Sequence, residues 1–511
     1  MKILFLITPA LLLFTTTTIA QTPEDALRNA WFIPNGTARN IAIGGAMGSL
    51  GGDISANNIN PAGIGLFKTM EVVATPVFSF NNNDIDFRGT PSSINKSNFS
   101  FGPTGFIAGG MPNRKGSGTY SFSISVNQLA SFNNHIHYEG LNDVSSFSEQ
   151  YLEELVANNA DTISALSDYI FGSSLAFRTY LIDKVVDTFG NLIGYQTLVP
   201  VSTGVTQEND ETSRGGIYEI SLAYADNQQD KLYLGASLNI PLITYKNDRV
   251  YKESDISNDP DNNFNFFEYT ENFKSSGIGV NAKLGLIYKP QEMIRLGLAL
   301  HTPSFIFFND EIRAAITTDT EGYAGTLRES SDNLNNNAAG QRQYMQLTPW
   351  KIIGSASYVF REAEDIKQQR GFVTADIEFV NYQGARFYSS GSAVDQSSTG
   401  YYDELNSVTK NYLKANFNFR LGGELKFNLW AFRLGGAYYG SPYEDKILKA
   451  SRTMLSGGIG YRNHGIFIDA AYAYTINKDV NFPYRLNDKP NTFATLNNKR
   501  SNIILTVGIK I

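Results

Sequence analysis

The chain contains no cysteine and only four histidines among its 511 residues. The absence of cysteine excludes disulfides, thiolate metal sites and cysteine nucleophiles. Acidic residues outnumber basic ones, with 49 Asp and Glu against 42 Lys and Arg, so the formal net charge is −7. Nothing therefore predicts a basic surface that would neutralise nucleic-acid phosphates. The signatures G-x-S-x-G, H-E-x-x-H, G-x-G-x-x-G and the P-loop are missing as well. We therefore predict no enzyme activity, no cofactor and no metal site.

Long apolar runs are missing after the N-terminus. A spanning helix needs about 20 predominantly apolar residues, and no later segment provides them. The N-terminus itself has one lysine, an apolar run from Ile3 to Phe14, and small residues that end at Ala20. This order is typical of a secretory signal peptide, so we predict export and cleavage near Ala20.

Alternation of polar and apolar residues dominates the chain from Glu71 onward. In the C-terminal segment NIILTVGIKI, one face carries five large apolar residues, while Thr506, Gly508 and Lys510 lie on the other. A period of two residues places such sets on opposite faces of a β-sheet. The chain therefore predicts a protein built mainly of strands.

Alternation alone would also fit a soluble sandwich. Here the apolar faces are continuous and end in aromatic residues, whereas the polar faces carry charges and glycine. Aromatic girdles at both ends of an apolar band are typical of membrane barrel strands. The aromatic ends are Tyr288, Phe360, Tyr438, Tyr461 and Tyr474. We predict an all-β fold, a fourteen-stranded antiparallel transmembrane β-barrel.

The connections predict the topology. We expect strands at residues 71–80, 98–109, 118–127, 216–225, 231–245, 276–289, 293–302, 347–360, 371–382, 412–427, 430–440, 451–461, 465–475 and 501–511. Short turns alternate with long segments at 81–97, 128–215, 246–275, 303–346, 383–411 and 476–500, with one brief exception at 441–450. Short periplasmic turns and long extracellular loops are expected of outer-membrane barrels. The chain thus divides into a signal peptide (1–20), an N-terminal segment (21–70) and a barrel (71–511).

The segment GGDISANNINPAGIGLFKT, residues 51–69, has too much glycine and asparagine for a helix and does not alternate. Within it, Asn60, Pro61, Ala62 and Gly63, preceded by Asp53, resemble the N-terminal motif of the FadL/TodX family of outer-membrane transporters of hydrophobic compounds. Later segments such as TPWKIIGSASYVF and FRLGGAYYGSPY resemble the same family in the same order. The resemblance therefore covers nearly the whole mature chain.

The resemblance implies that residues 21–70 fold into the barrel lumen as a hatch, or plug. Glycine permits close backbone contacts there, and Asn and Asp side chains bind backbone groups that no strand ladder pairs. An ordinary periplasmic linker is the alternative. Such a linker would not need the apolar side chains of Ile41, Ile43, Met47 and Leu50.

The resemblance also implies a function in the outer membrane of a Gram-negative bacterium. Long-chain fatty acids or other hydrophobic small molecules would be captured at the extracellular loops and released laterally through the barrel wall into membrane lipid. Some relatives of such barrels instead act as anchors or shuttles for secreted proteins, and the motif does not discriminate between the two. A Ser/His/Asp set carried on loops would leave no signature either.

The longest loop, 128–215, is predicted to be partly helical. Apolar residues recur in it at helical spacing and predict two amphipathic helices joined near NNAD. The candidate ligand contacts are Leu152, Leu155, Val156, Ile163, Leu166, Phe171 and Phe177. The alternative is that these residues pack the loop onto the barrel rim.

Two further candidate sites lie on the strands. Inward-facing Arg295, Arg420 and Arg433 are suited to an acidic head group, although lumenal arginines also pair with neighbouring carboxylates. The most interrupted strand, FSFGPTGFIAGG, contains Gly102, Pro103 and Gly105, and proline removes a ladder donor. We expect either a lateral opening or a structural bulge there.

Two of the four histidines, His135 and His137, share one face at the outer end of a strand. A metal or haem contact is one interpretation of this pair. A solvated rim is the other, and we favour it because no carboxylate stands between them in the sequence.

Overall fold

A computed structural model describes residues 23–112, 118–257, 259–360, 370–390 and 396–511. Its main sheet has twenty-one strand segments, all paired antiparallel. Several barrel strands consist of two segments separated by a bend. In chain order the fourteen barrel strands are β1–β2 (Glu71–Ala74, Pro76–Phe87), β3–β4 (Thr90–Phe101, Thr104–Pro112), β5–β6 (Gly118–Ser131, Asn134–Asn142), β9 (Val205–Gln228), β10 (Leu232–Asp255), β11 (Phe266–Gln291), β12–β13 (Ile294–His301, Phe305–Asp319), β15–β16 (Gly340–Leu347, Lys351–Phe360), β17–β18 (Gly371–Asn381, Arg386–Ser389), β19 (Ala415–Phe427), β20 (Trp430–Tyr439), β21 (Ser451–Asn463), β22 (Ile466–Asn481) and β23 (Ala494–Lys510).

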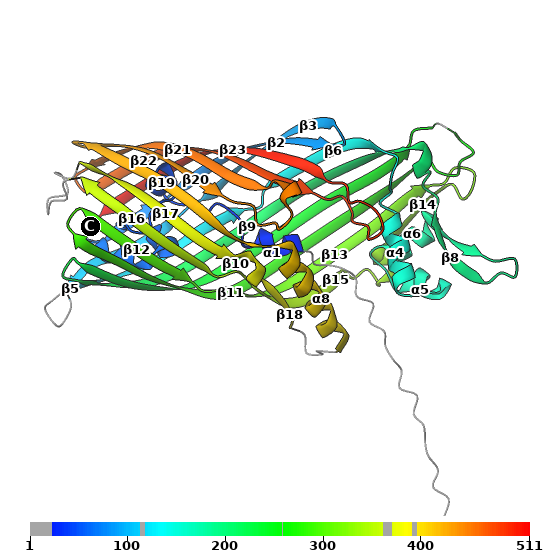
Figure 1. Ribbon diagram of the computed structural model, residues 1–511, viewed down its shortest axis with the longest axis horizontal. Coiled ribbons are helices and arrows are strands. Elements are labelled where there is room, and N and C mark those ends of the chain that lie inside the picture. The colour runs from blue at the N-terminus through cyan, green and yellow to red at the C-terminus, as the bar shows by residue number, and fades with distance from the viewer. Residues whose placement is uncertain (1–22, 113–117, 258, 361–369, 391–395) are drawn as a thin grey trace, which may run out of the picture.

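The sheet closes on itself. The last strand, β23, pairs with β22 on one side and with both β1 and β2 on the other. Figure 1 shows the resulting tube, with the short turns at the left end and the small helices at the right end. The predicted closed barrel of fourteen antiparallel strands is confirmed.

An apolar belt surrounds the left part of the tube. On β10 the outward side chains are apolar from Leu232 to Leu242 and mostly polar from Thr244 onward, with Val250 as the exception, and exposed leucines, phenylalanines and tyrosines continue the belt on the other strands. Such a belt matches the hydrocarbon core of a bilayer. None of the described helices is long and apolar enough to cross a membrane.

The strands continue well beyond this belt, which the sequence did not predict. β9, β10 and β11 have 24, 24 and 26 residues. The segment 81–97, expected as a loop, is instead a tight hairpin in which Phe87 is paired with Thr90. Outside lipid both faces of a strand are polar or mixed, so the alternation that marks the belt fades there.

Short helices lie at the right end of the tube in Figure 1, among the long loops that we predict to be extracellular. The cap, as we call residues 143–204, contains α4 (Glu149–Ala157), α5 (Thr162–Ser167), α6 (Ser173–Arg178), the hairpin β7–β8 (Ile182–Val186, Leu192–Thr197) and a 3-10 turn, η2 (Val201–Thr203). The expected helices in this region are present, as three short helices rather than two. Smaller elements lie elsewhere around this end: β14 (Thr326–Ser330), α7 (Ser331–Leu334), η4 (Tyr382–Gly384), α8 (Gln396–Tyr412) and η5 (Lys446–Leu448).

The N-terminal segment, residues 23–70, lies against the inner faces of strands all around the tube. It contains α1 (Pro23–Arg28), α2 (Ala38–Ala42), α3 (Ala56–Ile59) and η1 (Pro61–Leu66). Its hydrogen-bond partners come from β5, β9, β11, β12, β16, β17, β21 and β23. A segment that bonds to eight strands on different sides of a barrel occupies its lumen.

The motif around Asn60 holds this segment in shape. The Asn60 side chain accepts a hydrogen bond from Ala62 N (3.1 Å), which caps η1, and donates one to Gly48 O (2.6 Å). Asp53 accepts bonds from Thr37 Oγ1 (2.8 Å) and from the backbone of Ser55. These side chains satisfy backbone and hydroxyl groups that have no ladder partner.

Glycines let the segment touch the wall directly. Gly44 has φ +71° and lies against β20, where a Cβ on Gly435 would come within 2.2 Å of Gly44 N. A Cβ on Gly422 of β19 would approach Ile43 O equally closely. Only glycine permits such backbone-to-backbone contact. The glycine pairs of these two strands therefore fit the N-terminal segment.

Candidate functional site

A cavity lies in the lumen, within the loop that the N-terminal segment forms there. Residues 29–35 form one side of it and residues 40–59 contribute another, with barrel strands completing the wall. The empty space there, including the part open to solvent, is about 1090 Å³.

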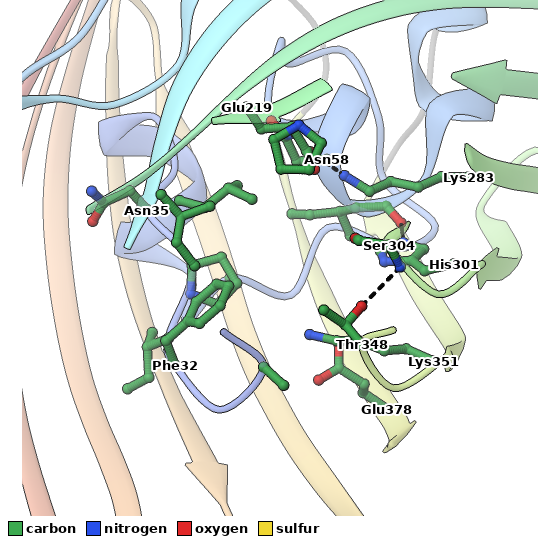
Figure 2. Close-up of a pocket in the computed structure, with 18 of the residues that line it drawn as sticks. Phe32, Asn35, Asn58, Glu219, Lys283, His301, Ser304, Thr348, Lys351 and Glu378 are labelled. Carbon is green, nitrogen blue, oxygen red and sulfur yellow. Dashed lines mark hydrogen bonds and ion pairs between the residues drawn. The ribbon is translucent and has the colours of Figure 1, made fainter. Parts of the chain in front are cut away.

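The cavity is amphipathic. Its apolar lining comes from several strands and from the N-terminal segment, and consists of Phe32, Ile33, Pro34, Ile41, Leu129, Ile217, Ile243, Ile306, Ile353 and Met454. Charged side chains gather at another part of the wall, namely Glu219, Lys283, Lys351, Glu378 and Arg420. Figure 2 shows Lys283 and Lys351 with Phe32 across the cavity. Such a site suits a molecule with one long apolar part and one polar end.

Three of the four basic side chains at this wall are already engaged. Lys283 forms an ion pair with Glu219, and Arg420 Nη2 lies 2.5 Å from Glu378 Oε2. His301 Nε2 lies 2.8 Å from Ile59 O. Lys351 differs, because no carboxylate oxygen of the described residues lies within 4 Å of its amine, which is 5.6 Å from the centre of the Phe32 ring. Lys351 is therefore the lining cation best able to bind a new anion.

A break in the wall lies beside this cavity. Among the described residues, β3 has a ladder to β2 only, and β5 beyond Val126 is paired only to β9, as is β6. The seam, as we call the gap between β3 and β5–β6, begins at Gly102 and Pro103, where the strand bends. Pro103 lacks the N–H that a ladder needs.

Side chains bridge the seam in place of a ladder. Lys96 Nζ donates to Asn134 O and to Ser213 O, both at 3.0 Å, and Ser92 Oγ donates to His137 O at 2.6 Å. Asn98 Nδ2 reaches Ser131 Oγ at 3.4 Å. A wall held by side chains separates more readily than one held by a continuous backbone ladder, because each bridge can rotate away.

The N-terminal segment covers the inner side of the seam. Asn35 N donates to Leu129 O (3.1 Å), and the Asn35 side chain donates to Gln128 O (2.8 Å). A Cβ on Gly102 would lie 3.1 Å from Gly36 O. Asn35 and Leu129 also line the cavity. Only this short stretch therefore separates the cavity from the seam.

The predicted lateral site is only partly at the seam. Gly102 and Pro103 lie at its start, and the Gly102 N–H donates to Thr75 O at 2.8 Å. Gly105 lies within β4 and is paired on both sides, with Val73 and with Ser125. The unpaired edge runs from the bend toward the extracellular end rather than toward Gly105.

The cap residues predicted to contact ligand form two groups. Leu155 and Phe177 are buried in an aromatic core with Tyr251 and Phe267 of the barrel, and Leu152, Leu166 and Phe171 pack against it. Val156 and Ile163 are 63% and 75% exposed. Most of the set thus holds the cap on the barrel rim, and only two members face solvent.

The three arginines predicted to bind ligand occupy different environments. Arg420 lines the cavity, as described above. Arg433 is fully buried between Glu424 and Asp469, at 2.6 Å from each, and is absent from the cavity lining. Arg295 donates to Leu50 O at 2.8 Å, so it binds the N-terminal segment.

The two histidines lie beside carboxylates that are distant from them in the chain. His135 Nε2 lies 3.1 Å from Asp210 Oδ2, and His137 Nδ1 lies 3.3 Å from the same oxygen. The partners come from β9, more than 70 residues away in the chain. In the described part of the chain, no group of three or more ligating residues has a geometry that could hold a metal ion.

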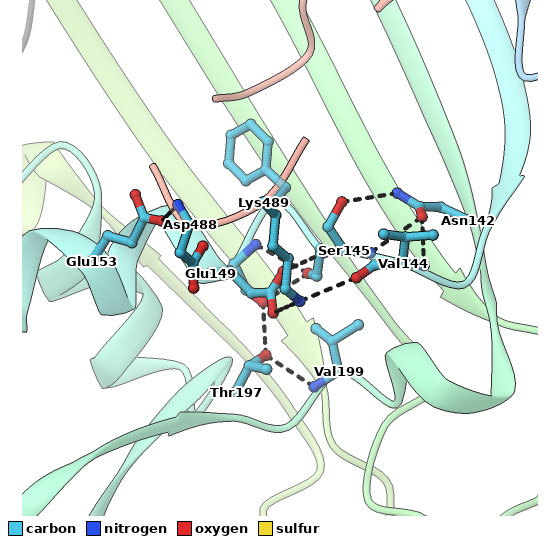
Figure 3. Close-up of polar contacts among 12 residues, drawn as sticks. Asn142, Val144, Ser145, Glu149, Glu153, Thr197, Val199, Asp488 and Lys489 are labelled. Carbon is cyan, nitrogen blue, oxygen red and sulfur yellow. Dashed lines mark hydrogen bonds and ion pairs between the residues drawn. The ribbon is translucent and has the colours of Figure 1, made fainter. Parts of the chain in front are cut away.

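Polar contacts also fasten the cap to the loop 482–493. Lys489 Nζ lies 2.6 Å from Glu149 Oε1 and donates to Val144 O (Figure 3). Glu153 accepts from Asn487 N at 2.8 Å. Nearby, the buried Glu253 accepts hydrogen bonds from Ser146 Oγ (2.5 Å) and Phe147 N (2.8 Å) at the start of the cap.

The pH should control this attachment. Burial raises the pKa of the Glu253 carboxyl from 4.5 to about 7, although its hydrogen bonds act in the opposite direction. A raised folded-state pKa means that the docked cap binds the proton more tightly than the detached one. Docking is therefore strongest below pH 4.5 and weakens as the pH rises through 7, by ~3 kcal/mol at most.

We expect hydrogen-exchange protection of residues 146–157, corrected for intrinsic exchange rates, to be lower at about pH 8.5 than at about pH 6. Glu253→Gln, which keeps an oxygen acceptor, should remove this difference. Glu139→Gln, at an exposed position, is the matched control and should keep it. A pH dependence that survives in Glu253→Gln would contradict the assignment.

The sequence did not indicate Asn35 or Lys351. Asn35 precedes the recognised motif, and Lys351 begins a strand as many surface lysines do. The alternation of the strand was the nearest signal for Lys351, because it places Lys351 on the same face as Ile353 and Ser355.

Comparison with solved structures gives the fold a precedent. A crystal structure of a Pseudomonas aeruginosa FadL homologue superposes with a TM-score of 0.52 at 12% identity, covering 94% of this chain and 99% of that chain. The protein has a FadL/TodX-like fold. The Pseudomonas putida toluene transporter TodX is similar to the same degree, with a TM-score of 0.52 and 11% identity over the same shares of the two chains. No family model and no curated protein matches the chain.

Proposed function

We propose that this protein is an outer-membrane transporter that takes up hydrophobic small molecules in a Gram-negative bacterium, and that it is not an enzyme. The observation that carries the proposal is the amphipathic cavity beside a break in the barrel wall. The FadL/TodX-like fold supports it, since solved proteins of this fold include ones named as a toluene transporter and as a monoaromatic hydrocarbon channel. The leader at residues 1–20 agrees with export, with cleavage near Ala20 and the N-terminal segment serving as a hatch.

We further propose long-chain fatty acids as the cargo. A neutral hydrocarbon would need only the apolar wall, and the amine of Lys351 would then face it without benefit. A fatty acid fills the apolar part with its chain and brings its carboxylate to Lys351. A hydrogen bond between charged groups is worth about 1.5–3 kcal/mol, so the head group contributes measurably.

The release route that we propose is lateral. Cargo leaves the cavity past Asn35 and Leu129, crosses the seam and enters the lipid beside Gly102. An apolar chain gains about 0.8 kcal/mol per CH₂ on leaving water, and direct passage into lipid keeps that gain. An exit through the wet periplasmic end would lose it.

Lys351→Met tests the cargo assignment. Oleic acid and methyl oleate serve as probes, because they differ only in the charge of the head group. We expect the variant to bind oleic acid ~10–100-fold more weakly and methyl oleate with unchanged affinity, measured on the purified full chain by equilibrium dialysis. Lys410→Met, at an exposed position on α8, is the matched control and should change neither.

Each contrary result has a definite meaning. Equal weakening for acid and ester would show that Lys351 only shapes the cavity. Unchanged binding of the acid would remove Lys351 as the head-group site. Failure of the unaltered protein to retain either probe would reject hydrophobic uptake itself.

A further inference from the structure

Three cations stand in one row on the outer wall, just above the apolar belt. Arg214, Lys246 and Lys274 lie on the adjacent strands β9, β10 and β11. Lys246 is directly opposite Arg214 on one side and Lys274 on the other. All three side chains are exposed. We call this set the basic row.

Such a row is unfavourable by itself. Like charges directly opposite one another on neighbouring strands destabilise the pair, because the strands are only about 4.8 Å apart. Local carboxylates balance it only in part. Glu311 Oε2 is 4.0 Å from Lys274 Nζ, whereas the described residues place no carboxylate oxygen within 4 Å of the charged groups of Arg214 or Lys246. Arg214 and Lys246 are therefore open to an external anion.

The remaining charged neighbours leave the row positive. Asp248 stands two residues beyond Lys246 and accepts a hydrogen bond from Asn272 at 2.9 Å. Asp210, two rungs above Arg214, faces the histidine pair. Lys96 is a further basic residue near the row. Burial and then the neighbouring charge of Arg214 lower the pKa of its ammonium.

The height of the row indicates which anion is available. Lys246 follows Leu242, where the continuous apolar run of its strand's outward face ends, by four positions. At about 3.3 Å per residue and a strand tilt near 40°, this places its backbone roughly 10 Å above the belt. Long basic side chains reach back toward the interface, so their charged ends lie at the level of the lipid head groups. Below the row, Tyr218, Leu242 and Ile278 form an apolar surface for acyl chains.

We propose that Arg214, Lys246 and Lys274 bind the phosphate group of a phosphorylated lipid in the outer leaflet. Arginine binds phosphate through two parallel hydrogen bonds, and the two lysines add point charges along the row beside it. The acyl chains of the same lipid lie against the belt below. Arg214 follows Ser213, whose carbonyl receives Lys96 across the seam, so the lipid is held at the edge of the seam. This site requires the membrane location and is independent of cargo uptake.

The double variant Arg214→Gln/Lys246→Gln tests the site. Dioleoyl phosphatidic acid and dioleoylglycerol serve as probes, because they share their acyl chains and differ in the phosphate. Native mass spectrometry of the full chain should show preferential retention of phosphatidic acid by the unaltered protein. Each lost cation near a charged lipid surface is worth about a fivefold change, so we expect the double variant to retain phosphatidic acid ~30-fold less well, with dioleoylglycerol unchanged.

The matched control removes two other cations from the same strand region. Lys231→Gln/Lys252→Gln changes positions at the opposite end of β10 and far above the row, and should keep the preference. Equal loss in both double variants would mean that overall charge alone attracts the lipid, which would overturn the site. Displacement of phosphatidic acid by millimolar inorganic phosphate would also overturn it, because a free anion would then be the ligand. Unchanged oleic acid binding in Arg214→Gln/Lys246→Gln separates this site from the cavity.

Discussion

A cross-link between positions 98 and 131 is expected to abolish fatty-acid uptake while leaving the barrel assembled. Asn98 and Ser131 face each other across the seam, with their side chains 3.4 Å apart. The chain has no cysteine, so Asn98→Cys/Ser131→Cys introduces the only two thiols and allows a short bifunctional reagent to join them. If cargo leaves laterally, a covalent bridge at this point stops release, and uptake of labelled oleic acid by cells should fall to the level of cells without the protein.

The control places the same chemistry in a continuous ladder. Asp248→Cys/Asn272→Cys joins β10 to β11, where the two side chains are 2.9 Å apart and the backbone is already paired. Its cross-link should not change uptake. Reduction of a disulfide version of the seam bridge should restore transport, which shows that the barrel was intact. Uptake that persists through the sealed seam would exclude the lateral route.

The second large effect concerns stability. Arg420 is buried against two carboxylates, with Nη2 at 2.5 Å from Glu378 and Nη1 at 3.7 Å from Asp376. Asp376 in turn accepts hydrogen bonds from Met47 N and Gly48 N of the N-terminal segment. Arg420→Met would leave both carboxylates without their main counter-charge, and breaking a buried pair in this way costs about 3–5 kcal/mol.

Equilibrium unfolding in urea, with the protein refolded in detergent, measures this cost. Arg328→Met, at an exposed position, is the control and should change the free energy of unfolding by less than about 0.5 kcal/mol. The double variant Arg420→Met/Glu378→Gln should recover part of the loss, since it removes a charge that the single variant leaves unpaired. A loss below about 1 kcal/mol in the single variant would mean that water reaches this site.

The barrel could be predicted because lipid on one face and the lumen on the other require apolar and polar side chains to alternate within the belt. Leu232 to Leu242 must alternate with lumenal residues, and this pattern is visible in the sequence. Beyond Thr244 no such constraint acts, so the strands predicted at 216–225, 231–245 and 276–289 stop short of the parts of β9, β10 and β11 that extend past the belt. The hairpin at Phe87 and Thr90 was missed for a related reason, because its outward residues are polar and its inward face mixes Asn81 and Asn83 with Ile85 and Phe87.

The functional site was less predictable, because it depends on pairs that are distant in the chain. The motif around Asn60 is local and can be recognised, since its side chains cap neighbouring turns. Lys351 becomes distinctive only when Lys283 and Arg420 are seen to be paired already. The extent of the seam depends on which strands lack a partner, and the sequence indicated only the bend at Gly102 and Pro103.

The N-terminal segment also constrains the order of assembly. It is joined to β1, which pairs with the final strand, and Ala38 N already donates to Thr506 Oγ1 of that strand at 2.8 Å. If the barrel closed first, the segment would have to enter a lumen whose side chains have no partners until it arrives. We therefore expect the segment to be in place before the last strand pairs with β1, so that the wall closes around it. If cargo leaves by the proposed lateral route, the contact between Asn35 and Leu129 opposes release as well as stabilising the fold, so a change that strengthened it would gain stability and slow turnover.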